Sequence, residues 1–309
     1  MYIEKFKNFI EDFFLSGPIP ANAHIAEYTA SLVFLSLLIA TIGAFTGIRL
    51  AIGMSNCTNP RHRLWLHGAG ALTLGAGIWS MHFIGMLSYE MDMKVEYIPS
   101  LTFLSFVIAA LAAWVVLYIS QQKRYGWLRL LSASLLLGIA ICGMHYTGMA
   151  AMKMDADTYY IPSLFFASIV IAISAGAAAI VIINRLQNYT GAGGIVWQGV
   201  AACVMGIAIC GMHYTGMSAA VMVPWADCRY TPHQENHVLA IAVVLVSGAL
   251  FIGALLLGMQ LNKKMQQDRE GSEPIGSYSG HSVFMQLFAL LSVFVLLISA
   301  SYLFLNMRL

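Results

Sequence analysis

The sequence has few charged residues, which make up 10% of its 309 positions, whereas hydrophobic residues make up 59%. No aspartate or glutamate interrupts any of its long apolar runs. So little polar surface cannot cover a water-soluble globule, and the runs reach the roughly 20 residues that a helix needs to cross a bilayer. The composition therefore excludes a soluble protein and predicts an integral membrane protein.

The apolar runs also lack the alternation of polar and apolar residues that is typical of membrane β-barrel strands. An α-helix satisfies its backbone hydrogen bonds within one segment, so runs of this length are predicted to be membrane-spanning helices. We expect an all-α, polytopic membrane helical bundle with about eight transmembrane helices. The predicted spans are 28–53, 64–88, 97–120, 127–151, 160–183, 195–222, 237–262 and 283–305.

Cysteines are scarce as well, and the spacing of the five in the sequence predicts no disulfide framework. Residues 1–20 lack the unbroken apolar centre of a cleavable signal peptide and are interpreted as an amphipathic helix on the membrane surface. Lysine and arginine are concentrated in the loops on one side of the predicted spans, and acidic residues in the loops on the other. The positive-inside rule places the basic loops in the cytoplasm and both termini outside. Because topology explains these short basic loops, no nucleic-acid partner is expected.

One motif recurs in this apolar chain. Cys-Gly-Met-His-Tyr-Thr-Gly-Met stands at 142–149 and again at 210–217, and Trp-Ser-Met-His-Phe-Ile-Gly-Met at 79–86 is a looser third copy. Each copy lies near the end of a predicted span. The histidines of all three copies are therefore expected at one depth in the membrane.

The motif repeats with the period of a second marker. His82 and His145 are 63 residues apart, and so are the Ile-Pro-Ser sequences that begin at Ile98 and Ile161. Two markers with one spacing indicate a duplicated unit. The first six spans, within 28–222, are predicted to be three repeated helix pairs in a pseudo-threefold arrangement.

The motif places soft metal ligands on one helix face. Residues four apart share a face, so each histidine is presented together with the second methionine of its copy. A buried imidazole without a partner costs a few kcal/mol, so three at one depth call for a common partner unless each bonds separately to neighbouring groups. Imidazole and thioether together suit copper, especially Cu(I). The predicted metal ligands are His82, His145, His213, Met86, Met149, Met217, Met81, Met144 and Met212.

Further residues of the motif have predicted supporting roles. Cys142 and Cys210, three residues before their histidines, could join the same face. Tyr146 and Tyr214 either form a structural hydrogen bond or orient an imidazole as neighbours of the metal ligands. Zinc is an alternative to copper, and so is haem, although three equivalent histidines offer no obvious axial pair.

Three such motifs on alternate helices of a six-span unit resemble the MHYT domain, a bacterial membrane sensor module. Its signature, Met-His-Tyr-Thr, stands at 144–147 and 212–215, and the resemblance covers about 28–222. It implies a protein of the bacterial cytoplasmic membrane whose motif residues bind copper and thereby sense oxygen, carbon monoxide or nitric oxide. In such a membrane, the termini that the positive-inside rule places outside are periplasmic. In the first copy Phe83 and Ile84 replace tyrosine and threonine, so a role for those two side chains cannot apply there.

Many members of that family continue into cytoplasmic cyclase or phosphodiesterase domains. Here a seventh span, 237–262, is followed by a cytoplasmic linker, 263–282, and an eighth span, 283–305. The linker is too short for a catalytic domain. A sensor of this kind is expected to signal through a separate partner protein.

The sequence leaves three functions open. The first is a copper-binding sensor of a diatomic gas or of redox state. The second is a copper-dependent membrane oxidase or oxygenase, since an open coordination position also serves catalysis, and a substrate-sized cavity beside the histidines would favour it. The third is copper acquisition or transport, which further methionines on the outer side, such as Met91 and Met93, keep open.

Overall fold

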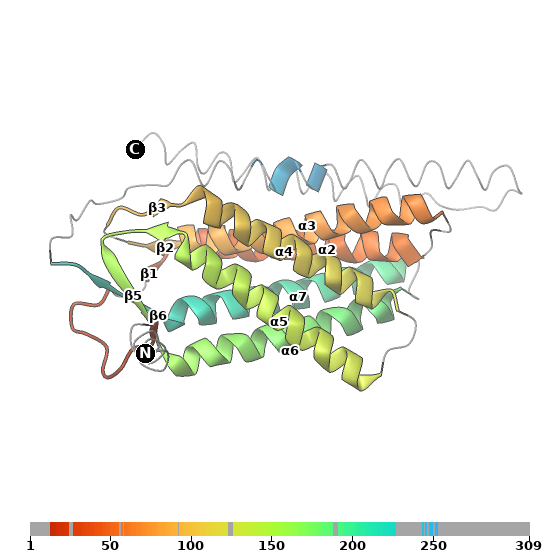
Figure 1. Ribbon diagram of the computed structural model, residues 1–309. Coiled ribbons are helices and arrows are strands. Elements are labelled where there is room, and N and C mark those ends of the chain that lie inside the picture. Colours follow the sequence, from red (N-terminus) through yellow and green to blue (C-terminus); the bar gives the residue numbers. More distant parts are fainter. Residues whose placement is uncertain are drawn as a thin grey trace, which may run out of the picture.

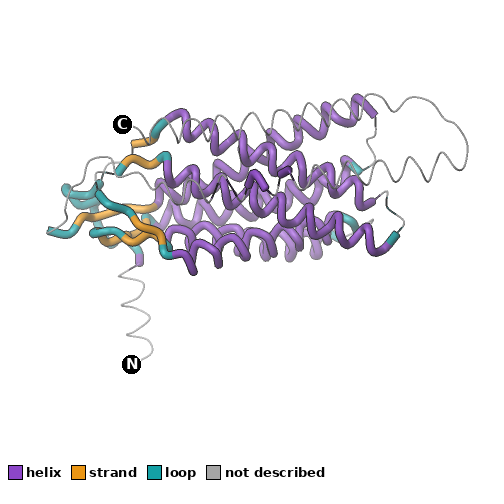
Figure 2. Tube along the Cα trace, turned by 90° about the horizontal axis from the view of Figure 1, so that it is seen from above, coloured by secondary structure: helices purple, strands orange, loops and turns teal. Residues whose placement is uncertain are grey.

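The structure is a bundle of six long helices with short strands at one end (Figures 1 and 2). This computed structural model describes residues 13–226, apart from 25, 26, 56, 58, 92, 123–125 and 188–190, together with scattered positions between 243 and 252. All six helices are long and apolar enough to cross a membrane. They are α2 (Ala30–Ser55), α3 (Pro60–Leu87), α4 (Pro99–Ser120), α5 (Trp127–Ala150), α6 (Pro162–Leu186) and α7 (Gly191–Ala219).

The first six predicted spans are thus confirmed as helices. The seventh, 237–262, is described only at scattered positions, which are helical. The linker 263–282 and the eighth span lie outside the described residues, so the count of eight stays a prediction.

Proline marks where three of the helices begin. Pro60, Pro99 and Pro162 each stand in the first turn, where the N–H that proline lacks would have no partner within the helix. Ahead of α3, the Asn59 side chain also accepts two backbone N–H groups of that turn, at 3.0 and 3.4 Å. The repeated Ile-Pro-Ser sequences are therefore the start signals of α4 and α6.

The six helices form a closed ring. Each packs against the next helix in the sequence, and α7 returns to pack against α2. Helix α3 is buried along most of its length, whereas α4, α5 and α6 expose large apolar side chains such as Leu111, Leu135 and Phe166. Apolar surface of this extent on long hydrophobic helices belongs in lipid. The chain is a multi-pass membrane protein.

Three two-stranded antiparallel ladders close the helix pairs at one end of the bundle, which we call the strand end. Each ladder joins the segment before the first helix of a predicted pair to the segment after its second helix. These strands are too short to show a periodic pattern in the sequence, but their pairing supports the helix pair as a structural unit. They are β1 (Glu27–Tyr28) with β2 (Tyr89–Glu90), β3 (Glu96–Tyr97) with β4 (Met152–Lys153), and β5 (Ala156–Tyr160) with β6 (Ala220–Pro224).

The amphipathic helix predicted for 1–20 does not extend over residues 14–20, and residues 1–12 lie outside the described part of the chain. Gly17 has a positive φ of 114°, and Pro18 follows it, so this stretch cannot continue a helix. The rings of Phe13 and Phe14 pack edge-on against Phe165 with centroids 5.5 and 5.3 Å away. This segment therefore packs on the start of α6.

Candidate metal centre

The three motif histidines lie at the same level of the bundle. His82 of α3, His145 of α5 and His213 of α7 each stand five or six residues before the strand end of their helix. All three side chains are completely buried. The equal position of the motif within each helix thus brings the histidines together, as the repeat predicted.

The Nδ1 atoms of the three imidazoles converge on one point. The Nδ1 of His82 lies 3.0 Å from that of His213 and 3.1 Å from that of His145, and the third edge of the triangle is 3.3 Å. The rings stand nearly perpendicular to one another, at 74° to 86°. Within the described residues they are the one group of histidine, cysteine or acidic side chains whose ligand atoms lie close enough to hold a metal.

Hydrogen bonds alone cannot satisfy this triangle. A neutral imidazole Nδ1 carries either a proton or a lone pair, so it can donate or accept but not both. At least two of the three atoms are therefore alike, and their contact is repulsive. A cation between three lone pairs removes that conflict.

The triangle also has the size of one face of a metal site. Imidazole nitrogens bind zinc at about 2.0–2.1 Å, which places tetrahedrally arranged donors about 3.3 Å apart. The observed edges of 3.0 to 3.3 Å come within a few tenths of an ångström of that spacing. The residues present therefore fit a small transition ion held by three nitrogens.

The opposite ring nitrogen, Nε2, is buried in all three histidines and has no hydrogen-bond partner. Each Nε2 instead lies against a motif glycine of another repeat, so closely that a Cβ added to that glycine would overlap the ring. A sequence motif does not show the direction of an imidazole ring, so the sequence alone could not identify the ring as the partner of these glycines. The contacts join His82 to Gly148, His145 to Gly216 and His213 to Gly85.

These contacts follow one cyclic order, from the first repeat to the second, from the second to the third and from the third to the first. The Nδ1 triangle and the glycine contacts thus relate the repeats in the way that a threefold arrangement requires. For the bundle as a whole, the pseudo-threefold axis stays a prediction.

All six predicted methionine ligands are buried, with exposed fractions of 4% or less. Burial places their side chains in the apolar interior of the bundle. Their coordination of a metal stays a prediction. These residues are Met81, Met86, Met144, Met149, Met212 and Met217.

The motif cysteines stand outside the histidine group, and the motif tyrosines bond serines of the neighbouring helices. Cys142 and Cys210 are buried free thiols outside it. The Tyr146 hydroxyl lies 2.9 Å from the Ser168 hydroxyl, and the Tyr214 hydroxyl 2.9 Å from that of Ser36. Since each serine donates its own proton to a carbonyl three residues earlier, the tyrosine is the donor in both pairs. The structure thus shows the structural hydrogen bond that was one of the two predicted roles.

The first repeat makes the same link with different residues. Phe83 stands where the other copies have tyrosine and has no hydroxyl to donate. Trp79, which replaces the motif cysteine, donates from its indole Nε1 to the Ser105 hydroxyl at 3.1 Å. Two substitutions within one copy therefore preserve a hydrogen bond from each motif helix to the following helix of the ring.

Aromatic residues cover the strand-end side of the third copy. The Tyr28 ring packs edge-on against Tyr89 and Tyr214, with centroids 5.3 and 5.7 Å apart. Burial raises the pKa of Tyr89 to about 12 and also raises the pKa of Tyr28. Burial therefore favours the neutral form of both phenols.

Long apolar helices, lipid-facing side chains and one buried histidine cluster define a membrane protein with a metal-type site. A bacterial family, MHYT, described as "Bacterial signalling protein N terminal repeat", matches the chain at 75–133, 138–193 and 206–262, which together exceed half of its length. The chain belongs to the MHYT family. It is a membrane signalling protein with the sensor domain of that family.

The chain is similar to curated proteins that are named as cyclic di-GMP enzymes or as a signalling protein. The chain is 38% identical over 237 residues to the bifunctional diguanylate cyclase/cyclic di-GMP phosphodiesterase MucR of Pseudomonas aeruginosa, a match covering 76% of this chain and 34% of that protein. It is 35% identical over 210 residues to the cyclic di-GMP phosphodiesterase NbdA of the same organism, covering 67% and 26%. The signaling protein YkoW of Bacillus subtilis is 37% identical over 196 residues, covering 62% and 24%. The chain thus spans about a third or less of these relatives, and no solved structure matches it.

The family repeat begins one helix later than the predicted helix pair. Each matched unit starts within a motif helix and continues through the helix that follows it. These are the helices that the tryptophan and tyrosine bonds to serine connect in the first two units. The third unit ends at residue 262 and so includes the predicted seventh span, which sequence reasoning had set apart from the sensor domain.

Proposed function

We propose that this protein is a copper-binding membrane sensor in which His82, His145 and His213 hold one Cu(I) through their Nδ1 atoms. The observation that carries the proposal is the convergence of three buried Nδ1 atoms within 3.3 Å of one another. The signal is a diatomic gas such as oxygen, nitric oxide or carbon monoxide, or the redox state of the metal. When bound, the ion supplies a coordination position for such a molecule.

Charge and donor type favour Cu(I) over zinc. The six described helices contain no aspartate or glutamate, so nothing anionic within them offsets an ion at the histidines. Burying charge is costly, and a monovalent ion costs less than a divalent one. The six motif methionines are buried, and their thioethers are soft donors that also prefer Cu(I).

The motif histidines lie against the backbone of neighbouring motif helices, which connects the site to the packing of these helices. Each imidazole lies between the Nδ1 triangle on one side and a glycine backbone of another repeat on the other. A ring that tilts as the occupancy of the site changes must press on that backbone or withdraw from it. We propose that this shifts α3, α5 and α7 relative to one another and so transmits the signal.

The named activities of the relatives suggest the destination of the signal. Two of them are called cyclic di-GMP phosphodiesterases, one of these also a diguanylate cyclase. We propose that the helix movement regulates turnover of cyclic di-GMP by a catalytic domain that this protein contacts in the cytoplasm.

The test is copper binding by the full chain in lipid nanodiscs under reducing conditions. We expect about one copper per chain, and loss of that copper in the triple variant His82→Ala/His145→Ala/His213→Ala. The matched control is His67→Ala, because His67 lies at the opposite end of α3 and bonds the Trp114 carbonyl at 3.0 Å. Infrared spectra with carbon monoxide should show a band that shifts with the heavier carbon isotope. Equal copper in the triple variant and the wild type would overturn the proposal.

A further inference from the structure

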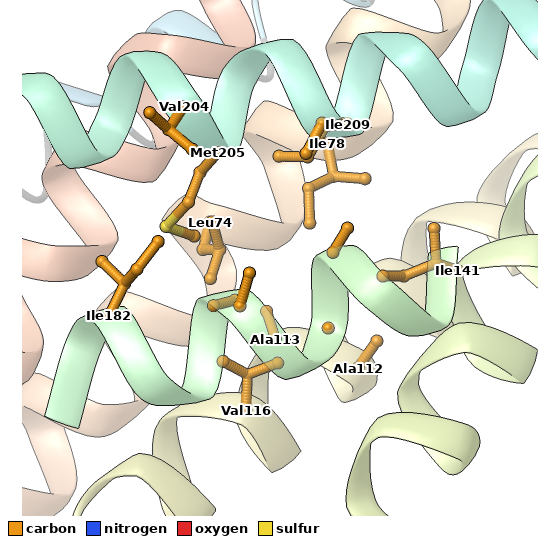
Figure 3. Close-up of a pocket in the computed structure, with 15 residues that line it drawn as sticks. Leu74, Ile78, Ala112, Ala113, Val116, Ile141, Ile182, Val204, Met205 and Ile209 are labelled. Atoms are coloured by element: carbon orange, nitrogen blue, oxygen red, sulfur yellow. The ribbon is translucent and has the colours of Figure 1, made fainter. Parts of the chain in front are cut away.

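An apolar cavity of about 50 Å³ lies within the ring of helices, and its walls come from α3, α4, α5, α6 and α7 (Figure 3). Three of its lining residues are Ile78, Ile141 and Ile209, each four residues before a motif histidine. Four residues make about one turn of helix, or roughly 5–6 Å. The cavity therefore ends about one helical turn from the histidine cluster.

On its own helix, each of the three isoleucines is the lining residue closest in sequence to the motif histidine. They occupy equivalent positions of the three repeats and are buried, with exposed fractions of 7% to 9%. Their β-branched side chains have few rotamers. A molecule that moves from the cavity toward the histidines along α3, α5 or α7 passes these three isoleucines, which we call the isoleucine layer.

The cavity also reaches the surface of the bundle. Two of its lining residues, Ala178 of α6 and Val204 of α7, are exposed, Val204 by 50%. Both lie near the middle of their helices, at the depth of the hydrocarbon core if the helices span the bilayer. The opening between α6 and α7 therefore faces lipid chains rather than water.

Size and chemistry limit what the cavity can hold. Its lining is almost entirely aliphatic, with small side chains such as Ala113 and Ala179 leaving the space. Empty apolar cavities in proteins stay dry, and an engineered one of about 150 Å³ binds benzene or xenon. About a third of that volume suits a diatomic molecule and is too small for a lipid-like oxidase substrate.

We propose that this cavity is a lateral route by which a small apolar gas enters from the bilayer and waits beside the histidine cluster, with the isoleucine layer as its gate. Apolar gases partition into hydrocarbon, so an opening at mid-membrane draws on the phase in which they are concentrated. The purpose of the route rests on the proposed function, but occupancy of the cavity does not require a metal.

Xenon tests the cavity alone. Nanodisc-embedded protein without copper should bind xenon, detected by xenon NMR exchange, and Ala113→Leu should abolish binding because the added side chain fills the space. The matched control is Cys203→Leu, which adds volume at an exposed position of α7 outside the lining and should bind xenon as the wild type does. Absence of xenon from the wild type, or full binding by Ala113→Leu, would overturn the proposal.

Gas kinetics test the route. In copper-loaded protein, Ala178→Phe narrows the opening at an exposed position that tolerates bulk, so folding is retained. We expect carbon monoxide to associate and dissociate several-fold more slowly with an unchanged dissociation constant. Narrowing a route lowers the rates of entry and exit by the same factor. Wild-type rates in Ala178→Phe refute the route while copper binding stands. Failure to bind copper refutes the proposed function and leaves the xenon result intact.

Discussion

Replacing Gly148 by alanine should weaken copper binding through the imidazole of another repeat. The new Cβ would overlap Nε2 of His82, whose ring is completely buried and whose Nδ1 belongs to the metal-type triangle. Relief of such overpacking typically costs about 1–3 kcal/mol. If the ring relieves the overlap by tilting away from the triangle, metal binding has to return it to the overlapping position. That cost corresponds to an affinity for copper about 5-fold to 150-fold weaker.

The same helix provides the control. Gly143 lies five residues earlier on α5, and a Cβ there would meet nothing within 4 Å. Alanine is the better helix former by about 0.8–1 kcal/mol, so Gly143→Ala should leave the copper affinity unchanged and the melting temperature equal or higher. Affinity is measured by competition with a Cu(I) chelator, and stability by thermal unfolding in nanodiscs. If Gly148→Ala binds copper as tightly as Gly143→Ala does, the contact between Gly148 and His82 does not position the ring.

Three further changes test the surroundings of the site. Tyr146→Phe removes the hydrogen bond to Ser168 and should lower the free energy of unfolding by about 1 kcal/mol, seen as a lower melting temperature with copper still bound; loss of copper instead would assign the phenol to the site. Met149→Leu conserves the buried volume, so it should lower the free energy of unfolding by less than about 1.5 kcal/mol, but it removes the thioether. We expect a drop in Cu(I) affinity at near-constant stability, and unchanged affinity would make Met149 a packing residue only. Trp79→Cys should weaken the packing of α3 on α4 and lower the free energy of unfolding, because Ser105 loses its indole donor. Adding Phe83→Tyr should recover part of that loss in a double-mutant cycle, and additive effects would show that the two positions do not substitute for each other.

The histidine level could be predicted because it depends only on counting along helices. Equal spacing of His82 and His145 from their Ile-Pro-Ser markers fixes both the helix boundary and the depth of the imidazole, whatever the side chains do. The ring direction could not be predicted in the same way. Whether Nδ1 or Nε2 faces the centre depends on side-chain torsions that neighbouring repeats determine, and these neighbours are far apart in the sequence.

The same limit explains the partners that were missed. Ser36 bonds Tyr214 across 178 positions of sequence, and it stands in a run that reads only as an apolar span. The strands were missed because segments of two to five residues carry no periodic pattern. The sequence carries one signal of these hydrogen bonds. The motif copy that lacks tyrosine has Trp79, whose indole can donate a hydrogen bond instead.

The contacts between the motif histidines and the glycines of other repeats connect all three motif helices. Each imidazole lies against its two counterparts through Nδ1 and against a glycine of the following repeat through Nε2, so it has close neighbours on both sides. Side chains locked in this way respond together, because a packed interior shifts between discrete arrangements and does not deform continuously. In the proposed sensor, a ligand that acts on one histidine would therefore act on α3, α5 and α7 at once, because each ring lies against a glycine backbone of another motif helix.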